Sequence, residues 1–148
     1  MQDLTSPRPS PPRTRRGQDT RAAILRAAEA VIGETGFAAA SIADITKRAG
    51  IAQGTFYIYF SSKDEVFREL VVEMGRLTRA YLTEAVADAP DRLTAERRGL
   101  RAYLGFVVER PALYSIVMEA RFVAPDAYRA HYTTFARGYA QNLGTAAR

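Results

Sequence analysis

Apolar residues take up a helical spacing along this chain, and they do so abruptly near Thr20. Residues 1–18 hold four prolines and four arginines and almost no apolar side chain. Such a segment cannot offset the entropy lost on ordering, so we predict a disordered basic arm over 1–18. Beyond it, apolar residues recur every three or four positions, at Ile24, Ala27, Ala28, Val31 and Ile32. This spacing predicts a helix from about Thr20, closed by Gly33 and Gly36.

Two short helices are predicted next, joined at a glycine. Ser41 precedes an apolar pattern over 42–49, and Asp44 follows three residues later. The serine hydroxyl can accept from free amides of the first turn, while the carboxylate lies near the positive end of the helix dipole. Gly50 can end this helix because glycine adopts positive φ without strain. Residues 52–59 are long enough for about two further turns, so the pair predicts a helix-turn-helix.

Longer amphipathic helices are predicted after Ser62, which precedes two acidic residues in a typical start signal. The helical period then continues over 64–81 for about five turns, and 88–91 interrupt it. Further helices are expected at 93–109, at 113–121, and from Asp126 onward, behind Pro125. The sequence therefore predicts an all-α chain. A three-helix head over 19–63 is joined by a long fourth helix to a partial helical ligand-binding and dimerisation domain over 64–148.

The charge of the chain is unevenly distributed. The net charge is +5 at pH 7, and residues 1–63 carry nine Lys or Arg against five Asp or Glu, whereas 64–148 carry twelve against eleven. A basic N-terminal part permits nucleic acid or an anionic membrane surface as a partner. The absence of cysteine excludes disulfides and thiolate metal sites. With no bilayer-length apolar run and no secretory signal, we expect a soluble cytoplasmic protein that does not enter a membrane.

The second helix of the pair carries the candidate chemistry, because the second helix of a helix-turn-helix lies in the major groove of DNA. Gln53 and Thr55 offer hydrogen-bond donors and acceptors at its start, where base edges are reached. Gly54 lets the backbone approach DNA closely. Phe56 and Phe60 are four residues apart and are predicted to face the core.

Phosphate contacts are predicted around this helix. Tyr57 and Tyr59 can donate from their hydroxyls to phosphate oxygens, and Lys47, Arg48 and Lys63 flank the groove with positive charge. Taken without its surroundings, the same aromatic cluster is also compatible with core packing alone. The arginines of the arm similarly fit either a solvated tail or a segment that reaches a minor groove.

The stretch SIADITKRAGIAQGTFYIYFSSKDEVF resembles the signature of the TetR family of bacterial transcriptional regulators. The resemblance covers about residues 20–70. It combines the capping serine, the Ala-Gly turn, the Gly-Thr-Phe-Tyr recognition helix and the Ser-Lys start of the fourth helix. Thr46 departs from the alanine usual in the family, and its hydroxyl can bond back to the preceding turn. The resemblance implies DNA contacts in or beside the groove from Gln53, Thr55 and Tyr57, and backbone contacts from Ser41, Tyr59 and Lys63.

The resemblance further implies a repressor that binds a double-stranded DNA operator as a homodimer and is released by a small-molecule effector. The candidate lining of an effector pocket comprises Tyr103, Phe106, Tyr114, Met118, Phe122, Tyr128, His131 and Phe135. Such a stripe is also compatible with ordinary core packing. His131 has neither a cysteine nor a second histidine to complete a metal site, so no metal and no cofactor is expected.

The end of the chain bears on dimerisation. The family ordinarily continues into two further helices that form the dimer interface, and the residues after Asn142 cannot make another helix. We therefore expect an effector-binding domain that is incomplete relative to the family, either because the protein is naturally short or because its end is missing.

The sequence also bears on two other functional classes. An enzyme is not expected, because the sequence has no glycine-rich phosphate loop, no cysteine nucleophile and no Ser-His-acid arrangement. The alternative is a helical protein-interaction module, without sequence-specific DNA binding, that uses the basic arm and its amphipathic faces. Sequence selectivity on DNA separates the regulator from this alternative.

Overall fold

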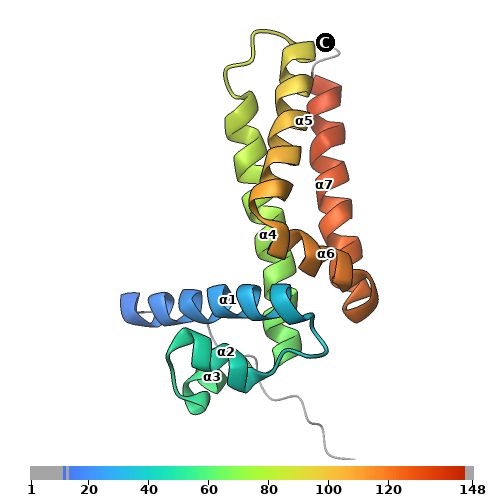
Figure 1. Ribbon diagram of the computed structural model, residues 1–148. Helices are drawn as coiled ribbons and strands as arrows, with labels where there is room; N and C mark the ends of the chain where they lie inside the picture. Colours follow the sequence, from blue (N-terminus) through green and yellow to red (C-terminus); the bar gives the residue numbers. More distant parts are fainter. Residues whose placement is uncertain (1–11, 13, 146–148) are drawn as a thin grey trace, which may run out of the picture. The chain divides into compact units, whose positions relative to one another are not determined.

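The computed structural model describes residues 12 and 14–145, with side chains described up to 140. These residues form seven α-helices (Figure 1), so the predicted all-α class is confirmed. The helices are α1 (Arg15–Thr35), α2 (Ile42–Ala49), α3 (Gln53–Tyr59), α4 (Lys63–Val86), α5 (Arg92–Glu109), α6 (Pro111–Val123) and α7 (Pro125–Thr145).

The described residues form two compact units that meet within α4. Residues up to Leu70 belong to the first unit and residues from Val71 to the second. The sequence prediction divides the chain between residues 63 and 64, whereas the first turns of α4 pack in the first unit. One continuous helix is therefore shared by both units.

Helix α1 begins at Arg15, earlier than the predicted start at Thr20. The cause is Thr14, whose hydroxyl accepts a hydrogen bond of 3.1 Å from the backbone N–H of Gly17 and so caps the helix. The predicted disorder over 1–18 is thus wrong for residues 15–18, while residues 1–11 and 13 of the predicted arm lie outside the described residues. Gly36 ends α1 with φ of 82°.

Helices α2 and α3 form the predicted helix-turn-helix. Ser41 caps α2 by accepting from the backbone N–H of Asp44 at 3.0 Å, and Gly50 ends it in the left-handed region with φ of 69°. Both signals are confirmed. Thr46 is buried, and its hydroxyl donates to the carbonyl of Ala43 at 3.1 Å, so this departure from the family pattern is satisfied within its own turn.

The core of the first unit is built around Phe56 and Phe60, whose side chains are fully buried, as the sequence predicts. Their ring centres are 5.8 Å apart. The guanidinium of Arg21 in α1 lies over the Phe60 ring, with its central carbon 4.9 Å from the ring centre. The same guanidinium forms an ion pair of 3.0 Å with Glu69. Helix α3 is therefore anchored in this core through Phe56.

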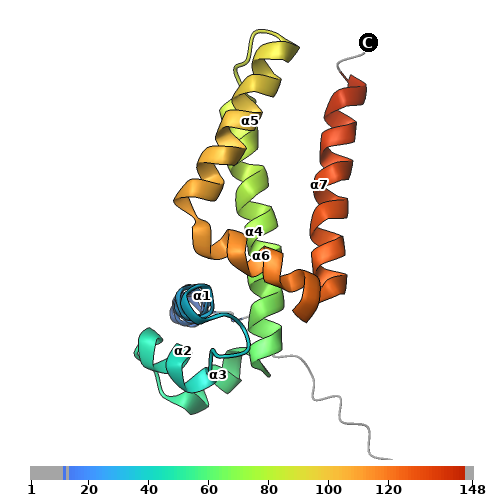
Figure 2. The same cartoon turned by 45° about the vertical axis from the view of Figure 1, so that its right-hand side comes forward.

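The second unit comprises the rest of α4 with α5, α6 and α7. Figure 2 shows α6 as a short helix that crosses between the lower ends of α5 and α7. Its buried residues are Leu113, Ile116, Val117 and Ala120. Gly75 of α4 allows α7 to approach, because a Cβ at this position would lie 3.1 Å from Nδ1 of His131. None of the described helices has the length and hydropathy needed to cross a membrane.

Candidate nucleic-acid interface and helical pocket

The outward face of α3 is defined by what its opposite face buries. Successive helical residues are rotated by about 100°, so Gly54 and Ile58, two positions before and after the buried Phe56, point away from the core. A Cβ at Gly54 would meet nothing within 4 Å. Tyr57 and Ile58 are 51% and 67% exposed. The outward face thus presents Gly54, Tyr57 and Ile58 to solvent.

The predicted groove residues lie on or beside this face. Gln53 is exposed at the first position of α3, and Thr55 is half-buried in its first turn, with its backbone N–H bonded to the carbonyl of Ala52 at 3.0 Å. The Tyr57 ring meets the edge of Phe56, with 5.4 Å between centres. Ile58 was not among the predicted site residues, although its position opposite Phe56 could have identified it.

Two of the residues predicted to contact the DNA backbone also have partners within the first unit. Ser41 is half-buried and its hydroxyl is used in capping α2. Tyr59 is also half-buried, and its hydroxyl lies 3.6 Å from the position that a Cβ of Gly17 would take. Tyr59 therefore packs toward the start of α1, which gives it a structural role beside the predicted one.

The three flanking cations also differ from one another. Lys47 is exposed at the end of α2. Arg48 forms an ion pair of 2.9 Å with Glu34 of α1. Lys63 donates to the backbone carbonyls of Phe37 at 2.5 Å and Ala40 at 2.7 Å. Arg48 and Lys63 thus hold elements of the first unit together, and Lys47 is the cation most available to a phosphate.

Lys63 joins the start of α4 to the loop between α1 and α2. Besides its two carbonyl partners, the ammonium lies 4.3 Å from the centre of the Phe37 ring. That ring packs edge-on against Phe67, with 4.9 Å between centres. An ammonium has three N–H donors, so a contact with DNA would use the third donor or break one of these bonds. This geometry makes Lys63 a positioning residue.

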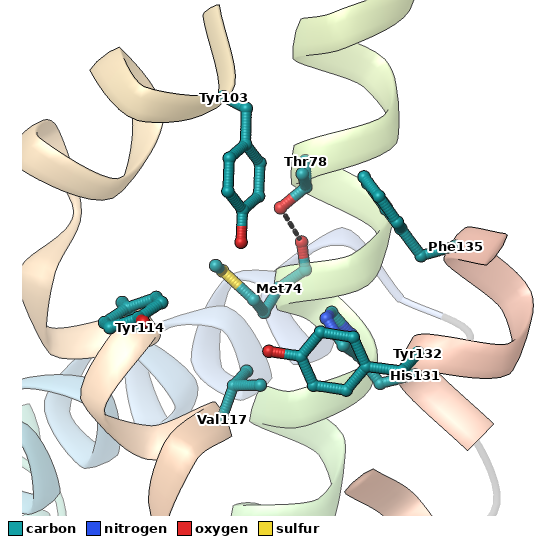
Figure 3. Close-up of a pocket in the computed structure, with 8 residues that line it drawn as sticks. All are labelled: Met74, Thr78, Tyr103, Tyr114, Val117, His131, Tyr132 and Phe135. Carbon is teal, nitrogen blue, oxygen red and sulfur yellow. Dashed lines mark hydrogen bonds between the residues drawn. The ribbon is translucent and has the colours of Figure 1, made fainter. Parts of the chain in front are cut away.

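A cavity of about 20 Å³ lies among the helices of the second unit (Figure 3). Four predicted residues line it, namely Tyr103, Tyr114, His131 and Phe135. Four lining residues were not predicted, namely Met74, Thr78, Val117 and Tyr132. A helical period shows which residues face inward and not which helices they meet, so no signal in the sequence would have found them. The cavity has room for one water molecule.

The other four predicted pocket residues lie outside this cavity. Phe106 is buried against Tyr81, with ring centres 5.7 Å apart. The Tyr128 ring lies tilted against the Tyr132 ring, with 4.8 Å between their centres. Met118 is 37% exposed and Phe122 is 80% exposed. Phe106 and Tyr128 therefore pack within the unit, while Phe122 faces solvent.

The lining is largely apolar and aromatic, with a few hydroxyls and one imidazole, and carries no acidic side chain, lysine or arginine. Figure 3 shows the hydroxyls of Tyr103 and Tyr132 pointing inward toward Met74, and the Thr78 hydroxyl donates to the Met74 carbonyl at 2.8 Å. Burial, together with the neighbouring tyrosines, raises the pKa of Tyr132 to about 12, so its hydroxyl keeps its proton at neutral pH.

His131 stands out among the lining residues. Its Nδ1 is buried and has no hydrogen-bond partner within the described part of the chain. Burial lowers the pKa of His131 and nearby Arg79 lowers it further, while a backbone hydrogen bond at Val71 acts in the opposite direction. The imidazole is therefore neutral at neutral pH and retains an unused polar atom.

Comparison with known proteins finds similar chains among bacterial transcriptional regulators. Residues 24–70 match the family described as bacterial regulatory proteins, tetR family. The chain is 33% identical over 111 residues to the HTH-type transcriptional regulator EthR of Mycolicibacterium smegmatis, which covers 74% of this chain and 51% of that protein. It is 66% identical over 41 residues to the uncharacterized HTH-type transcriptional regulator YvdT of Bacillus subtilis, covering 28% of this chain and 21% of that one.

The chain thus spans about half, or less, of the length of these relatives. Among solved structures, a TetR family transcription regulator from Marinobacter aquaeolei VT8 superposes with a TM-score of 0.73. This match covers 90% of the present chain and 70% of the other, at 22% identity. At this identity the likeness demonstrates the shared helical fold.

The positioning role of Lys63 predicts a specific pattern of mutational effects. Lys63→Met keeps the aliphatic stem and removes both carbonyl bonds, so the free energy of unfolding should fall by about 1–3 kcal/mol. DNA affinity should fall as well, but the slope of log K against log salt should stay unchanged, because no phosphate contact is lost. Urea unfolding and fluorescence anisotropy at several salt concentrations measure the two effects.

Lys47→Met provides the matched control. This variant should keep the free energy of unfolding within about 0.5 kcal/mol of the wild-type value. The slope of log K against log salt should fall in magnitude by about 0.9 per chain, the value for one lost phosphate contact. If Lys63→Met reduced the slope in this way without loss of stability, the lysine would be a phosphate ligand and the positioning role would be refuted.

Proposed function

Because this chain belongs to the TetR family of bacterial regulatory proteins, we propose that it binds operator DNA sequence-specifically and represses transcription. The observation that carries this proposal is the outward face of α3, which is exposed, contains a glycine with open space above it, and is held by buried phenylalanines behind. Such a face can enter the major groove without disturbing the core that presents it. A chromosomal target would place the protein in the cytoplasm.

Different side chains in and beside α3 suit different parts of the DNA. Gln53 is exposed at the start of α3 and has the amide that pairs with adenine in the major groove. Tyr57, at the edge of the face, and Lys47, at the end of α2, are suited to phosphate oxygens. Phosphate contacts fix the register of the protein on the duplex, while base contacts select the sequence.

We further propose that the protein acts as a homodimer controlled by a small molecule. Two copies of α3 would meet half-sites about 34 Å apart, one turn of the duplex. Since α4 is continuous between the units, a ligand that displaces its second-unit part would act on the first-unit part that Lys63 anchors. The ligand can lower operator affinity only by binding one arrangement better than the other.

The cavity suggests the class of effector. A charged ligand would lose its hydration there without an ionic partner in the lining, because Arg79, the charged side chain near His131, does not itself line the space. An uncharged, largely apolar molecule with one hydrogen-bonding group suits the aromatic walls and the inward-pointing hydroxyls of Tyr103 and Tyr132. The volume of about 20 Å³ requires the cavity to expand when the ligand enters.

A second candidate function is supported by α5. Four aliphatic residues at helical spacing are between 56% and 79% exposed, namely Leu93, Leu100, Leu104 and Val108. A continuous apolar row of this kind is typical of surfaces that pack against another helix. This observation favours a helical protein-interaction module, which would bind DNA without selecting a sequence.

DNA selectivity decides between the two functions. The purified chain should bind the DNA upstream of its own gene more tightly than a scrambled duplex at the same salt concentration, as measured by anisotropy. Gln53→Ala should reduce this preference by roughly tenfold or more, the cost of one lost base contact. Thr133→Ala, an exposed change on α7, should have no effect. Equal affinity for both duplexes would favour the interaction module instead.

The effector site can be probed with Nile red, a neutral apolar dye. Its fluorescence should rise saturably on binding, and the bound dye should weaken operator affinity. Val117→Trp fills the cavity and should abolish dye binding while operator binding without dye persists. Saturable dye binding that survives in Val117→Trp, or no saturable binding to the wild type, would argue against this site.

A further inference from the structure

Ile58 is the most exposed large apolar side chain among the described residues of the first unit, at 67%. Single exposed aliphatic residues are common on protein surfaces and by themselves carry no meaning. The position of Ile58 is what distinguishes it. It lies on the outward face of α3, one helical turn after Gly54 and opposite the fully buried Phe56.

The surroundings of Ile58 leave its methyl groups uncovered on that face. Gly54 contributes no side chain, and the space above it is open to 4 Å. Tyr57, the other exposed neighbour, has its ring against the edge of Phe56. A surface brought against α3 would therefore meet Ile58 early, and the bare backbone at Gly54 would let that surface come close.

The major groove offers one feature that suits such a side chain. Each base pair displays hydrogen-bond donors and acceptors there, and the C5-methyl group of thymine is the apolar element. An aliphatic group pressed onto the polar edge of a G·C pair would desolvate that edge without supplying a partner. The same group on a thymine methyl removes apolar surface from water on both sides.

We propose that Ile58 is a specificity-determining residue that reads thymine in the operator through contact with its C5-methyl group. This inference rests on the proposed DNA-binding function and deepens it. Gln53 would select by hydrogen bonding at the start of α3, and Ile58 would select by apolar contact one turn further along. The operator would then contain a thymine, at a fixed position in each half-site, that cannot be exchanged without loss of affinity.

Deoxyuridine tests this proposal directly, because it lacks only the methyl group of thymidine. Operator duplexes carrying deoxyuridine at one thymine position at a time are titrated against wild type and Ile58→Ala by anisotropy. In the wild type, one position in each half-site should lose about fourfold in affinity, the factor for one buried methyl group. Ile58→Ala should bind the unmodified operator more weakly and show no further loss at that position.

Two additional variants secure the interpretation. Ile58→Val keeps a β-branched apolar side chain and should retain sensitivity to deoxyuridine. Val72→Ala makes a similar truncation at an aliphatic side chain that is 64% exposed on α4 and should leave the wild-type response unaltered. Circular dichroism of Ile58→Ala should show unchanged helicity, since alanine favours helix and the replaced side chain is not part of the core.

The outcomes distinguish failure of the Ile58 assignment from failure of the proposed DNA-binding function. A selective wild type that is insensitive to deoxyuridine at every position, or an Ile58→Ala variant that keeps the wild-type sensitivity, would overturn the assignment of Ile58 and leave the regulator intact. A wild type that does not distinguish operator from scrambled duplex would reject the proposed function, and the role of Ile58 would fall with it.

Discussion

Burial of Phe56 and Phe60 is the constraint on which the rest of this structure depends. Both rings are withdrawn completely from solvent, and burial of a phenylalanine stabilises a fold by about 1.5–3 kcal/mol. Helix α3 has only seven residues and is too short to be stable alone. Its orientation is therefore set by tertiary packing. Once these two rings face inward, Gly54, Tyr57 and Ile58 must face outward, and the chemistry available to a nucleic acid is fixed.

The same unit is tied to the long helix that leaves it. Lys63 bonds two loop carbonyls, and Phe37 packs on Phe67 one turn further along α4. A displacement of α4 would therefore be transmitted to the loop that leads into α2. The second unit, which includes the rest of α4, holds a small cavity. One of its lining residues is His131, whose buried Nδ1 has no hydrogen-bond partner among the described residues. In the proposed regulation, expansion of this cavity by an uncharged ligand is the step that would displace α4.

Local signals in the sequence were enough to predict most of the helix-turn-helix. The serine cap and glycine stop define α2, and the spacing of Phe56 and Phe60 defines the inner face of α3, because each depends on residues within one turn. The partners of Lys63 could not be predicted, since Phe37 is 26 positions away and the bonds go to backbone carbonyls. The contributions of Met74 and Val117 to the cavity were likewise missed, because helical spacing does not specify which helices become neighbours.

Contact between DNA and the outward face of α3 can be measured by hydroxyl-radical footprinting of the protein with and without operator duplex. Oxidation read by mass spectrometry should fall strongly at Tyr57 and Ile58 when operator is bound. Oxidation of Tyr139, which is 50% exposed on α7, should stay unchanged. If Tyr57 and Ile58 were oxidised at the same rate in free protein and in the saturated complex, another surface would bind the DNA and the account would be wrong.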